Sequence, residues 1–258
     1  MKTFHHRSGN HLDSDGARIY YEVAGNPQGS PLLVLHGGFG SMEDFNRFLP
    51  DLHREFQLIG IDSRGQGKST LGPGPLTYEQ IQKDVQRVLA HLNIQSLSII
   101  GFSDGGITAY RLACLTSLKL EKLVTIGARW HLKNTVPVRD ILSKVTADSW
   151  RNKFSSTVDS YQKLNPEPDF DRLAPAIVRM WLDPDASGYP NEAVKNISCP
   201  LLMVRGDEDH LLRIEAVAEL SNLVKNSKLL NIPFAGHAAF EDQKEIFMLG
   251  LNHFLDLA

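Results

Sequence analysis

Short apolar runs alternate with amphipathic stretches along most of the chain. The runs at residues 31–36, 56–61 and 97–100 have the length and composition of strands that are buried on both faces of a sheet. Between them, apolar side chains recur every three or four residues, as they do along one face of a helix. This order of strand and helix predicts a mostly parallel sheet covered by helices on both faces.

Further segments extend the same order in both directions. The other predicted strands are Arg18–Val23, Lys122–Ile126, Cys199–Val204 and Lys228–Ile232. Two helices are predicted to begin after the N-cap candidates Ser41 and Thr77. The buried face of the helix after Ser41 is expected to contain Phe45, Phe48, Leu49 and Leu52. The buried face of the helix after Thr77 is expected to contain Ile81, Val85, Val88, Leu89 and Leu92. Later helices are predicted over Ile214–Val224 and around Ile246, Leu249 and Phe254.

The alternation stops between about residues 129 and 190. All three tryptophans lie there, among proline-rich turns and helical pieces such as Val138–Val145 and Leu173–Leu182. We therefore expect an α/β core made of residues 1–129 and 191–258 and a helical lid or cap insertion at residues 130–190. The aromatic side chains of this insertion are typical of a cover over an apolar pocket. Alternatively, the insertion is a helical subdomain in which these side chains pack on one another.

Composition narrows the classes of function. The 258 residues are 42% hydrophobic and 22% charged, which is ordinary for a globular protein. The formal net charge of −3 does not favour nucleic acid as a partner. No run is long enough to span a membrane, and the first ten residues lack the apolar core of a signal peptide, so we expect a cytoplasmic protein. Nothing in the sequence indicates an oligomeric state.

Cysteines and N-terminal histidines give no sign of a metal or a cofactor. Cys114 and Cys199 have no metal-ligand spacing, and both are expected to be buried thiols. His5, His6 and His11 are more simply explained by a mobile polar N-terminus than by a metal site.

The most informative motif is Gly-Phe-Ser-Asp-Gly at residues 101–105. It follows an apolar strand and precedes a helical pattern, so Ser103 is expected at a sharp turn between strand and helix. Glycines two positions away on each side leave room for the strained backbone of such a turn. The Ser103 hydroxyl would then lie beside the free N–H groups at the start of the helix.

Two later loops supply candidate partners for Ser103. The strand ending near residue 205 leads into Asp207 and Asp209, and the last strand leads into His237. Because parallel strands direct these loops to the same edge of the sheet, a base and an acid can converge on the serine. Asp209 and Asp207 both remain possible as the acid on physical grounds.

Two other loops follow predicted strands. Residues 36–40, His-Gly-Gly-Phe-Gly, allow the backbone to approach a ligand closely and to direct N–H groups at it. Gly67-Lys68-Ser69 resembles the end of a phosphate-binding loop, but that motif requires glycine where Asp62 stands. Asp62 and Arg64 are instead expected to fix a turn through charge-assisted hydrogen bonds.

Taken in order, these motifs resemble the α/β-hydrolase superfamily over essentially the whole chain. The resemblance implies an α/β-hydrolase fold in which Ser103, Asp209 and His237 form the catalytic triad, with no metal and no cofactor. It also implies an oxyanion hole formed by the backbone N–H groups of Asp104 and Gly38, with Phe39 a second source for the latter. The implied reaction is hydrolysis of a small carboxylic ester through an acyl-enzyme on Ser103.

Asp104 places a carboxylate directly beside the nucleophile. The sequence Gly-x-Ser-Asp-Gly-Gly-Ile-Thr is similar to that of valacyclovir hydrolase-like (biphenyl hydrolase-like) enzymes, which implies that Asp104 binds the ammonium group of an α-amino ester. Alternatively, the carboxylate bonds a neighbouring group of the protein.

Other functions remain open on the same fold. The His-Gly-Gly motif at residues 36–38 also resembles proline iminopeptidases, and a carbon–carbon bond hydrolase would use the same triad. A non-catalytic receptor for a small ligand is a further alternative, because a fold does not fix a function.

Overall fold

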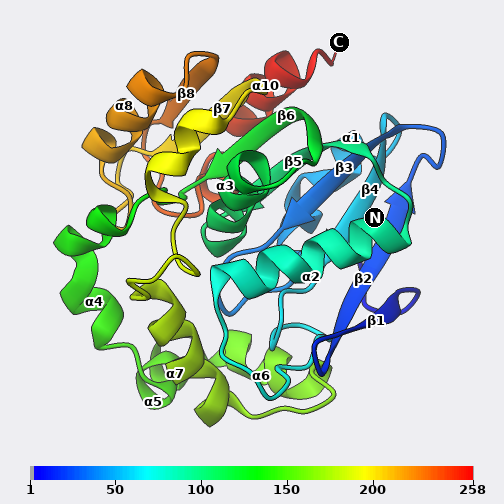
Figure 1. Cartoon of the computed structure of the whole chain (residues 1–258), viewed down its shortest axis with the longest axis vertical. Coiled ribbons are helices and arrows are strands. Elements are labelled where there is room, and N and C mark those ends of the chain that lie inside the picture. The colour runs from blue at the N-terminus through cyan, green and yellow to red at the C-terminus, as the bar shows by residue number, and fades with distance from the viewer. Residues whose placement is uncertain (1–2, 258) are drawn as a thin grey trace.

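The computed structural model describes residues 3–257. Its eight-stranded sheet has the order β1-β2-β4-β3-β5-β6-β7-β8 (Figure 1). Only the pairs β1–β2 and β2–β4 are antiparallel, so the predicted mostly parallel sheet is confirmed. The strands are β1 (Asn10–Ser14), β2 (Ala17–Gly25), β3 (Ser30–Leu35), β4 (Phe56–Ile61), β5 (Ser96–Phe102), β6 (Lys119–Ile126), β7 (Leu201–Gly206) and β8 (Ser227–Ile232).

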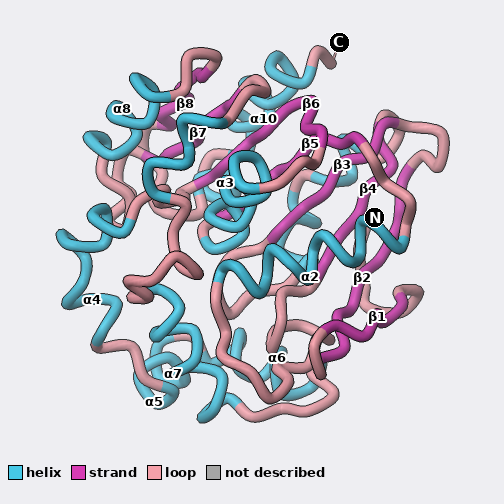
Figure 2. The backbone as a smooth tube through the Cα atoms, viewed as in Figure 1, coloured by secondary structure: helices cyan, strands magenta, loops and turns pink. Residues whose placement is uncertain are grey.

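Helices follow the strands and pack on both faces of the sheet (Figure 2). The α-helices are α1 (Leu49–Leu52), α2 (Tyr78–His91), α3 (Asp104–Leu115), α4 (Arg139–Ser143), α5 (Ala147–Lys153), α6 (Ser155–Leu164), α7 (Phe170–Trp181), α8 (Ile214–Leu223), α9 (Ala239–Asp242) and α10 (Lys244–Leu255). Three 3₁₀ helices join them: η1 (Met42–Arg47), η2 (Leu132–Val138) and η3 (Asn191–Asn196).

The strands divide the core into two layers, because successive side chains point to opposite faces. In β3, Leu33 and Leu35 face the layer that contains α2, α3 and α8, whereas Leu32 and Val34 face the layer that contains η1, α1 and α10. All of these side chains are buried, which explains why the central strands read as unbroken apolar runs.

Helical structure replaces the alternating pattern between β6 and β7, as expected. This stretch, which we call the helical segment, contains η2, α4 to α7 and η3 and lies beside the carboxyl ends of the central strands (Figure 1). The predicted helices Val138–Val145 and Leu173–Leu182 correspond to α4 and α7, each with slightly different ends.

One helical prediction needs correction. The first helix is divided into η1 and α1 around Phe48, although Ser41 caps it and all four expected apolar side chains are buried. The predicted closing helix is present as α10; its buried face is formed by Phe247, Met248, Leu251 and Leu255, and Leu249 is 74% exposed.

The N-terminal histidines do not belong to a mobile tail. His11 lies in β1, and His6 is buried between the carboxylates of Asp62 and Glu43. Among residues 3–257, no group of histidine, cysteine, aspartate and glutamate is placed to hold a metal ion, and no helix is long and apolar enough to cross a membrane. Both cysteines are buried free thiols, as predicted.

Candidate active site

Ser103 lies at the turn between β5 and α3, where its backbone adopts φ 50° and ψ −113°. The backbone is held in this unfavourable conformation by its neighbours. A Cβ atom at Gly105 would lie 1.9 Å from the carbonyl oxygen of Leu35, and one at Gly101 would lie 2.5 Å from the carbonyl oxygen of Gly105. Both positions therefore require glycine, as the motif predicted.

Three loops bring Ser103, His237 and Asp209 into one hydrogen-bonded chain. The Nε2 atom of His237 lies 3.0 Å from the Ser103 hydroxyl oxygen. The Nδ1 atom of His237 lies 3.0 and 3.1 Å from the two carboxylate oxygens of Asp209. This arrangement assigns the proton on the imidazole to Nδ1 and leaves Nε2 as the acceptor of the serine hydroxyl.

The acid candidate is held rigidly in its loop. Asp209 is 4% exposed, and its Oδ1 accepts the backbone N–H groups of Leu211 and Leu212 at 2.8 and 3.1 Å. Burial raises the pKa of Asp209, but the hydrogen bond and charge of His237 and these two N–H groups outweigh burial and lower it overall. Asp207 is exposed, and its side chain accepts only the backbone N–H of Ala235, at 3.4 Å, so Asp209 and not Asp207 lies beside the histidine.

The glycine-rich loop after β3 lies directly against the Ser103 turn. A Cβ atom at Gly37 would approach the ring of Phe102 to 2.9 Å, and one at Gly38 would lie 2.6 Å from Oδ2 of Asp104. Behind the loop, His36 accepts the backbone N–H of Ser63 with Nε2 and places Nδ1 2.7 Å from the carbonyl oxygen of Gly37. Glycine and a buried histidine thus let this loop reach the serine.

Phe39 anchors the same loop to the helical segment. Its backbone has φ 62°, and its ring lies 4.3, 5.4 and 5.7 Å from the rings of Trp150, Phe170 and Trp181. Such aromatic contacts add about 0.5–1.5 kcal/mol each beyond the area that they bury. Gly38 lines the cavity beside Ser103, whereas Phe39 lines a separate hollow of about 500 Å³ that none of the three triad candidates lines.

The carboxylate of Asp104 is enclosed by the protein. The indole N–H of Trp181 lies 2.9 Å from both oxygens, and the hydroxyl of Tyr78 donates to Oδ1 at 2.8 Å. Asp104 is 3% exposed, and burial raises its pKa although both hydrogen bonds lower it. Tyr78 and Trp181 were not expected here from the sequence, because both lie far from Ser103 along the chain.

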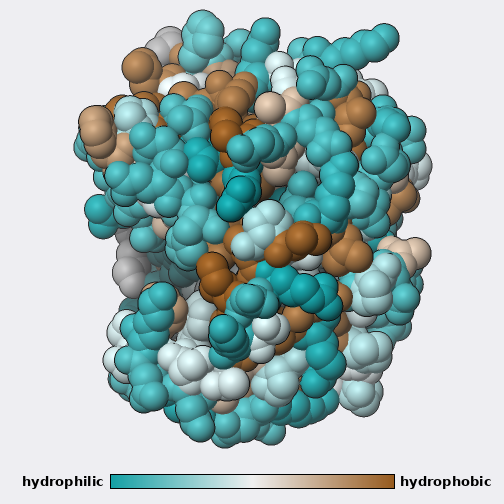
Figure 3. All heavy atoms as spheres, turned by 90° about the vertical axis from the view of Figure 1, so that its left-hand side faces the viewer, coloured by the Kyte–Doolittle hydropathy of each residue, from teal (hydrophilic) through white to brown (hydrophobic). Residues whose placement is uncertain are grey.

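A cavity of about 410 Å³ opens beside Ser103 and His237. Its floor includes Gly38 and Phe102, and the helical segment contributes Leu142, Trp150 and Trp181, among others, to its wall. In the surface view, hydrophobic atoms appear in the middle of the face that carries α4 and α8, between the two halves of the molecule (Figure 3). The site therefore combines a nucleophile, a base and an apolar space for a small substrate.

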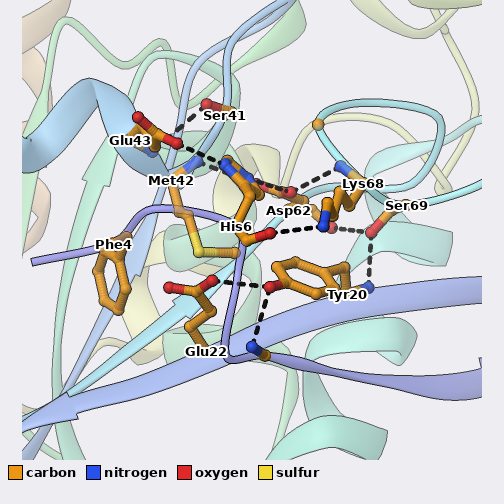
Figure 4. A network of polar contacts seen from close by, with 12 residues as sticks. Phe4, His6, Tyr20, Glu22, Ser41, Met42, Glu43, Asp62, Lys68 and Ser69 are labelled. Carbon is orange, nitrogen blue, oxygen red and sulfur yellow. Dashed lines mark hydrogen bonds and ion pairs between the residues drawn. The ribbon is translucent and has the colours of Figure 1, made fainter. Parts of the chain in front are cut away.

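A network of polar side chains holds the turn after β4 and the start of η1, the element that follows the glycine-rich loop (Figure 4). Asp62 accepts the backbone N–H groups of Met42 and Lys68 at 3.0 and 2.7 Å and lies 2.7 Å from Nε2 of His6. The Nδ1 atom of His6 lies 2.8 Å from Glu43. Asp62 therefore fixes the turn after β4, as predicted, and also the start of η1.

Arg64 fixes the other side of this turn. Its guanidinium forms a bidentate pair with Asp84 of α2 at 2.7 and 2.8 Å and also donates to the carbonyl oxygen of Ser14. Both charged groups are buried, so each hydrogen bond replaces contact with water. The structural role that was expected for Asp62 and Arg64 is thus confirmed.

Comparison with known proteins identifies related sequences and folds. The model of the alpha/beta hydrolase fold family matches residues 30–174, more than half of the chain. A bifunctional esterase/perhydrolase of Acinetobacter calcoaceticus is 28% identical over 86% of this chain and 90% of its own length. A 2-hydroxy-6-oxo-6-(2'-aminophenyl)hexa-2,4-dienoic acid hydrolase of Metapseudomonas resinovorans is 22% identical over 95% of this chain and 89% of its own.

Solved structures show the same architecture. A hydrolase from Pseudomonas aeruginosa superposes with a TM-score of 0.77 at 19% identity, covering 96% of this chain and 98% of that one. A thermophilic esterase from Thermogutta terrifontis gives a TM-score of 0.74 at 19% identity, with the same coverage. At this level of sequence identity, the similarity shows a shared fold and nothing further.

Proposed function

We propose that this chain, which belongs to the alpha/beta hydrolase fold family, is a serine hydrolase that cleaves small carboxylic esters through an acyl-enzyme on Ser103. The observation that carries the proposal is the hydrogen-bonded chain from Ser103 through His237 to Asp209. Relatives that are named as esterases support the same class of reaction.

The proposed first step is attack of the Ser103 oxygen on the ester carbonyl. Nε2 of His237 takes the hydroxyl proton, and Asp209 stabilises the resulting imidazolium and keeps Nδ1 protonated. The same imidazolium then protonates the leaving alcohol, which leaves the acyl group bound to Ser103. In the second step, His237 removes a proton from water, which attacks the acyl carbonyl and releases the acid and the free serine.

The oxyanion of each tetrahedral intermediate would be bound by backbone N–H groups. We assign them to Asp104, the first residue of α3, and to Gly38, which lines the cavity, with Phe39 as the alternative to Gly38. The positive end of the α3 dipole also favours negative charge at this point. Losing one such donor typically costs about 100- to 1000-fold in rate.

We also propose that residues 130–190 act as a cap over the substrate cavity. The support is that Leu142, Trp150 and Trp181 of this segment line the cavity beside Ser103. The cap would exclude water from the cavity and determine which acyl and alcohol groups of a substrate fit into it.

Two alternatives belong to other reactions of the same site. A carbon–carbon bond hydrolase is favoured by the dienoic acid hydrolase among the relatives, and a proline iminopeptidase-like aminopeptidase by the motif at residues 36–38. Cleavage of an α-amino ester would require the Asp104 carboxylate to bind the substrate ammonium. That carboxylate already accepts hydrogen bonds from the Trp181 indole and the Tyr78 hydroxyl. A receptor for a small ligand would bind without turnover.

Substitution of Ser103 tests the proposal. With p-nitrophenyl butyrate as substrate, Ser103→Ala is expected to lower kcat by about 10⁵-fold or more, because no other group replaces the nucleophile. Circular dichroism and thermal unfolding of the variant control for its fold. Full activity in a folded Ser103→Ala variant would overturn the mechanism, and binding without turnover across a broad panel of esters would support the receptor instead.

A further inference from the structure

The charged side chains that line the cavity beside Ser103 all have the same sign. Among the described residues that line it, Arg129, Lys144 and Lys153 are cationic and none is acidic. The chain as a whole has a net charge of −3, so this cavity departs from the rest of the molecule. We propose that the cavity takes esters that carry a second, ionised carboxyl group, an inference that rests on the proposed function and specifies its substrate class.

Arg129 provides the buried part of this charge. It follows β6, is 5% exposed, and donates to the Tyr189 hydroxyl at 3.4 Å and to the Leu211 carbonyl oxygen at 3.3 Å. Among residues 3–257 no carboxylate lies within ion-pair distance of Arg129. The Asp104 carboxylate attracts it from farther away but takes its hydrogen bonds from Trp181 and Tyr78. A buried guanidinium with long hydrogen bonds and unused donors is a site for an anionic oxygen.

Lys144 and Lys153 provide the exposed part. Both come from the helical segment, at the end of α4 and the end of α5, and both side chains are exposed where they line the cavity. The ammonium of Lys144 has no hydrogen bond or ion pair among residues 3–257, and the ammonium of Lys153 lies 5.1 Å from the ring of Phe154. By contrast, Lys133 nearby pairs with a glutamate. Unpaired ammonium groups at the mouth would attract and retain an anion.

The remaining wall is also rich in donors. The indole N–H of Trp150, another lining residue, is buried without an acceptor among the described residues. Indole N–H, guanidinium and ammonium groups can only donate hydrogen bonds, so they are complementary to carboxylate oxygens and not to a substrate ammonium. The apolar side chains between them fit the methylene chain of such a substrate.

Three esters that differ only in their terminal group test this inference. Monoethyl adipate ends in a carboxylate, ethyl adipamate in an uncharged amide of nearly the same shape, and ethyl 6-aminohexanoate in an ammonium. We expect kcat/KM to be about tenfold higher for the carboxylate than for the amide and lowest for the ammonium. The preference should fall with added salt, because the lysines are exposed. A parallel series of acetate esters of 6-hydroxyhexanoate and its amide places the charge on the alcohol side.

Variants identify the groups responsible. Lys144→Gln and Lys153→Gln should each lower the carboxylate-to-amide ratio by about two- to fivefold, as expected for exposed ion pairs. Lys163→Gln is the matched control, because Lys163 is an exposed lysine of α6 that lines only the separate hollow, and it should leave the ratio unchanged. Arg129→Gln should lower the ratio most, and thermal unfolding controls for its fold.

The outcomes separate this inference from the proposed function. If neutral esters are hydrolysed in a Ser103-dependent way but the carboxylate-to-amide ratio is one or less in both series, the substrate class is wrong and the function stands. A preference for the ammonium ester that Asp104→Asn removes would favour a cationic ester substrate instead. If no ester is hydrolysed through Ser103, the proposed function fails and the substrate class fails with it.

Discussion

At the scale of single residues, the site depends on side chains that hydrogen bonds hold in a single orientation. Asp209 illustrates this, since two backbone N–H groups bind one of its oxygens while both oxygens face Nδ1 of His237. An asparagine there would keep its carbonyl oxygen on the backbone N–H groups and turn its NH₂ toward the histidine. The imidazole would then carry its proton on Nε2 and could not accept one from Ser103.

We therefore expect Asp209→Asn to lower kcat for p-nitrophenyl butyrate by about 10⁴-fold. Asp207→Asn is the matched control, because Asp207 lies in the same loop and its side chain accepts only the backbone N–H of Ala235, at 3.4 Å. This control should retain most of the activity. A larger loss in Asp207→Asn than in Asp209→Asn would reassign the acid.

The limits of sequence reasoning at this scale are clear at Asp104. The motif correctly indicated the strained serine turn, because its glycines are required by local geometry. The partners of the Asp104 carboxylate, Tyr78 and Trp181, come from α2 and α7. Contacts between residues so far apart in the chain leave no local pattern, so only the folded structure reveals them.

At the scale of elements, the N-terminal segment packs against the start of η1 and the turn after β4. His6 lies between Asp62 and Glu43, and its ring stacks on Tyr20 at 5.5 Å. The adjacent Glu22 accepts the Tyr20 hydroxyl, and Lys68 donates to the carbonyl oxygen of His6. The three histidines in a polar sequence predicted a mobile N-terminus, because the carboxylate partners of His6 lie more than 30 residues away in the chain.

This network predicts a pH-dependent contribution to stability. Burial lowers the pKa of His6, but hydrogen bonds and charge attraction from Asp62 and Glu43 outweigh it and raise the pKa above 6.5. A raised pKa in the folded state means that the protonated histidine stabilises the fold. The contribution is fully present below the unfolded-state pKa and is lost as pH rises through the folded-state pKa.

His6→Asn should therefore lower the free energy of unfolding by about 2 kcal/mol at about pH 5.5 and by clearly less at about pH 9. Urea denaturation of both proteins at the two pH values measures the difference. His11→Asn is the control, because that imidazole contacts the Lys68 carbonyl oxygen and the Tyr20 ring. A difference that is the same at both pH values would contradict the charged role of His6.

Helix faces were harder to predict than helix positions. The pattern of α10 contains two overlapping apolar stripes, one through Ile246 and Leu249 and another through Phe247 and Leu251. The second is buried against the sheet, and the first faces outward. Which stripe is buried depends on how the helix meets β8 and α9, and periodicity alone does not contain that information.

At the scale of the whole molecule, the parallel sheet assembles the site. Ser103 follows β5, Asp209 follows β7 and His237 follows β8, so three segments that span 134 positions of the chain meet at one edge of the sheet. The sequence predicted this meeting because strand direction alone determines it. It did not predict the cationic wall of the cavity, because Arg129, Lys144 and Lys153 come together only when the helical segment packs on the core.

We therefore expect Ser103 to be reactive only when the protein is folded. A serine hydroxyl is a weak nucleophile unless a base removes its proton, and that base is supplied here by a distant loop. A fluorophosphonate ester reacts with serines that are activated in this way and forms a stable bond to the oxygen. Mass spectrometry of the digested protein then locates the adduct.

The measurement that tests the central claim most directly is fluorophosphonate labelling of the native and the urea-unfolded chain, followed by peptide mapping and an esterase assay. We expect one adduct, on the peptide that contains Ser103, with esterase activity lost in proportion to labelling and no adduct in the unfolded chain. Esterase activity that survives complete labelling of Ser103, or an inactivating adduct on another residue, would contradict the proposed role of Ser103.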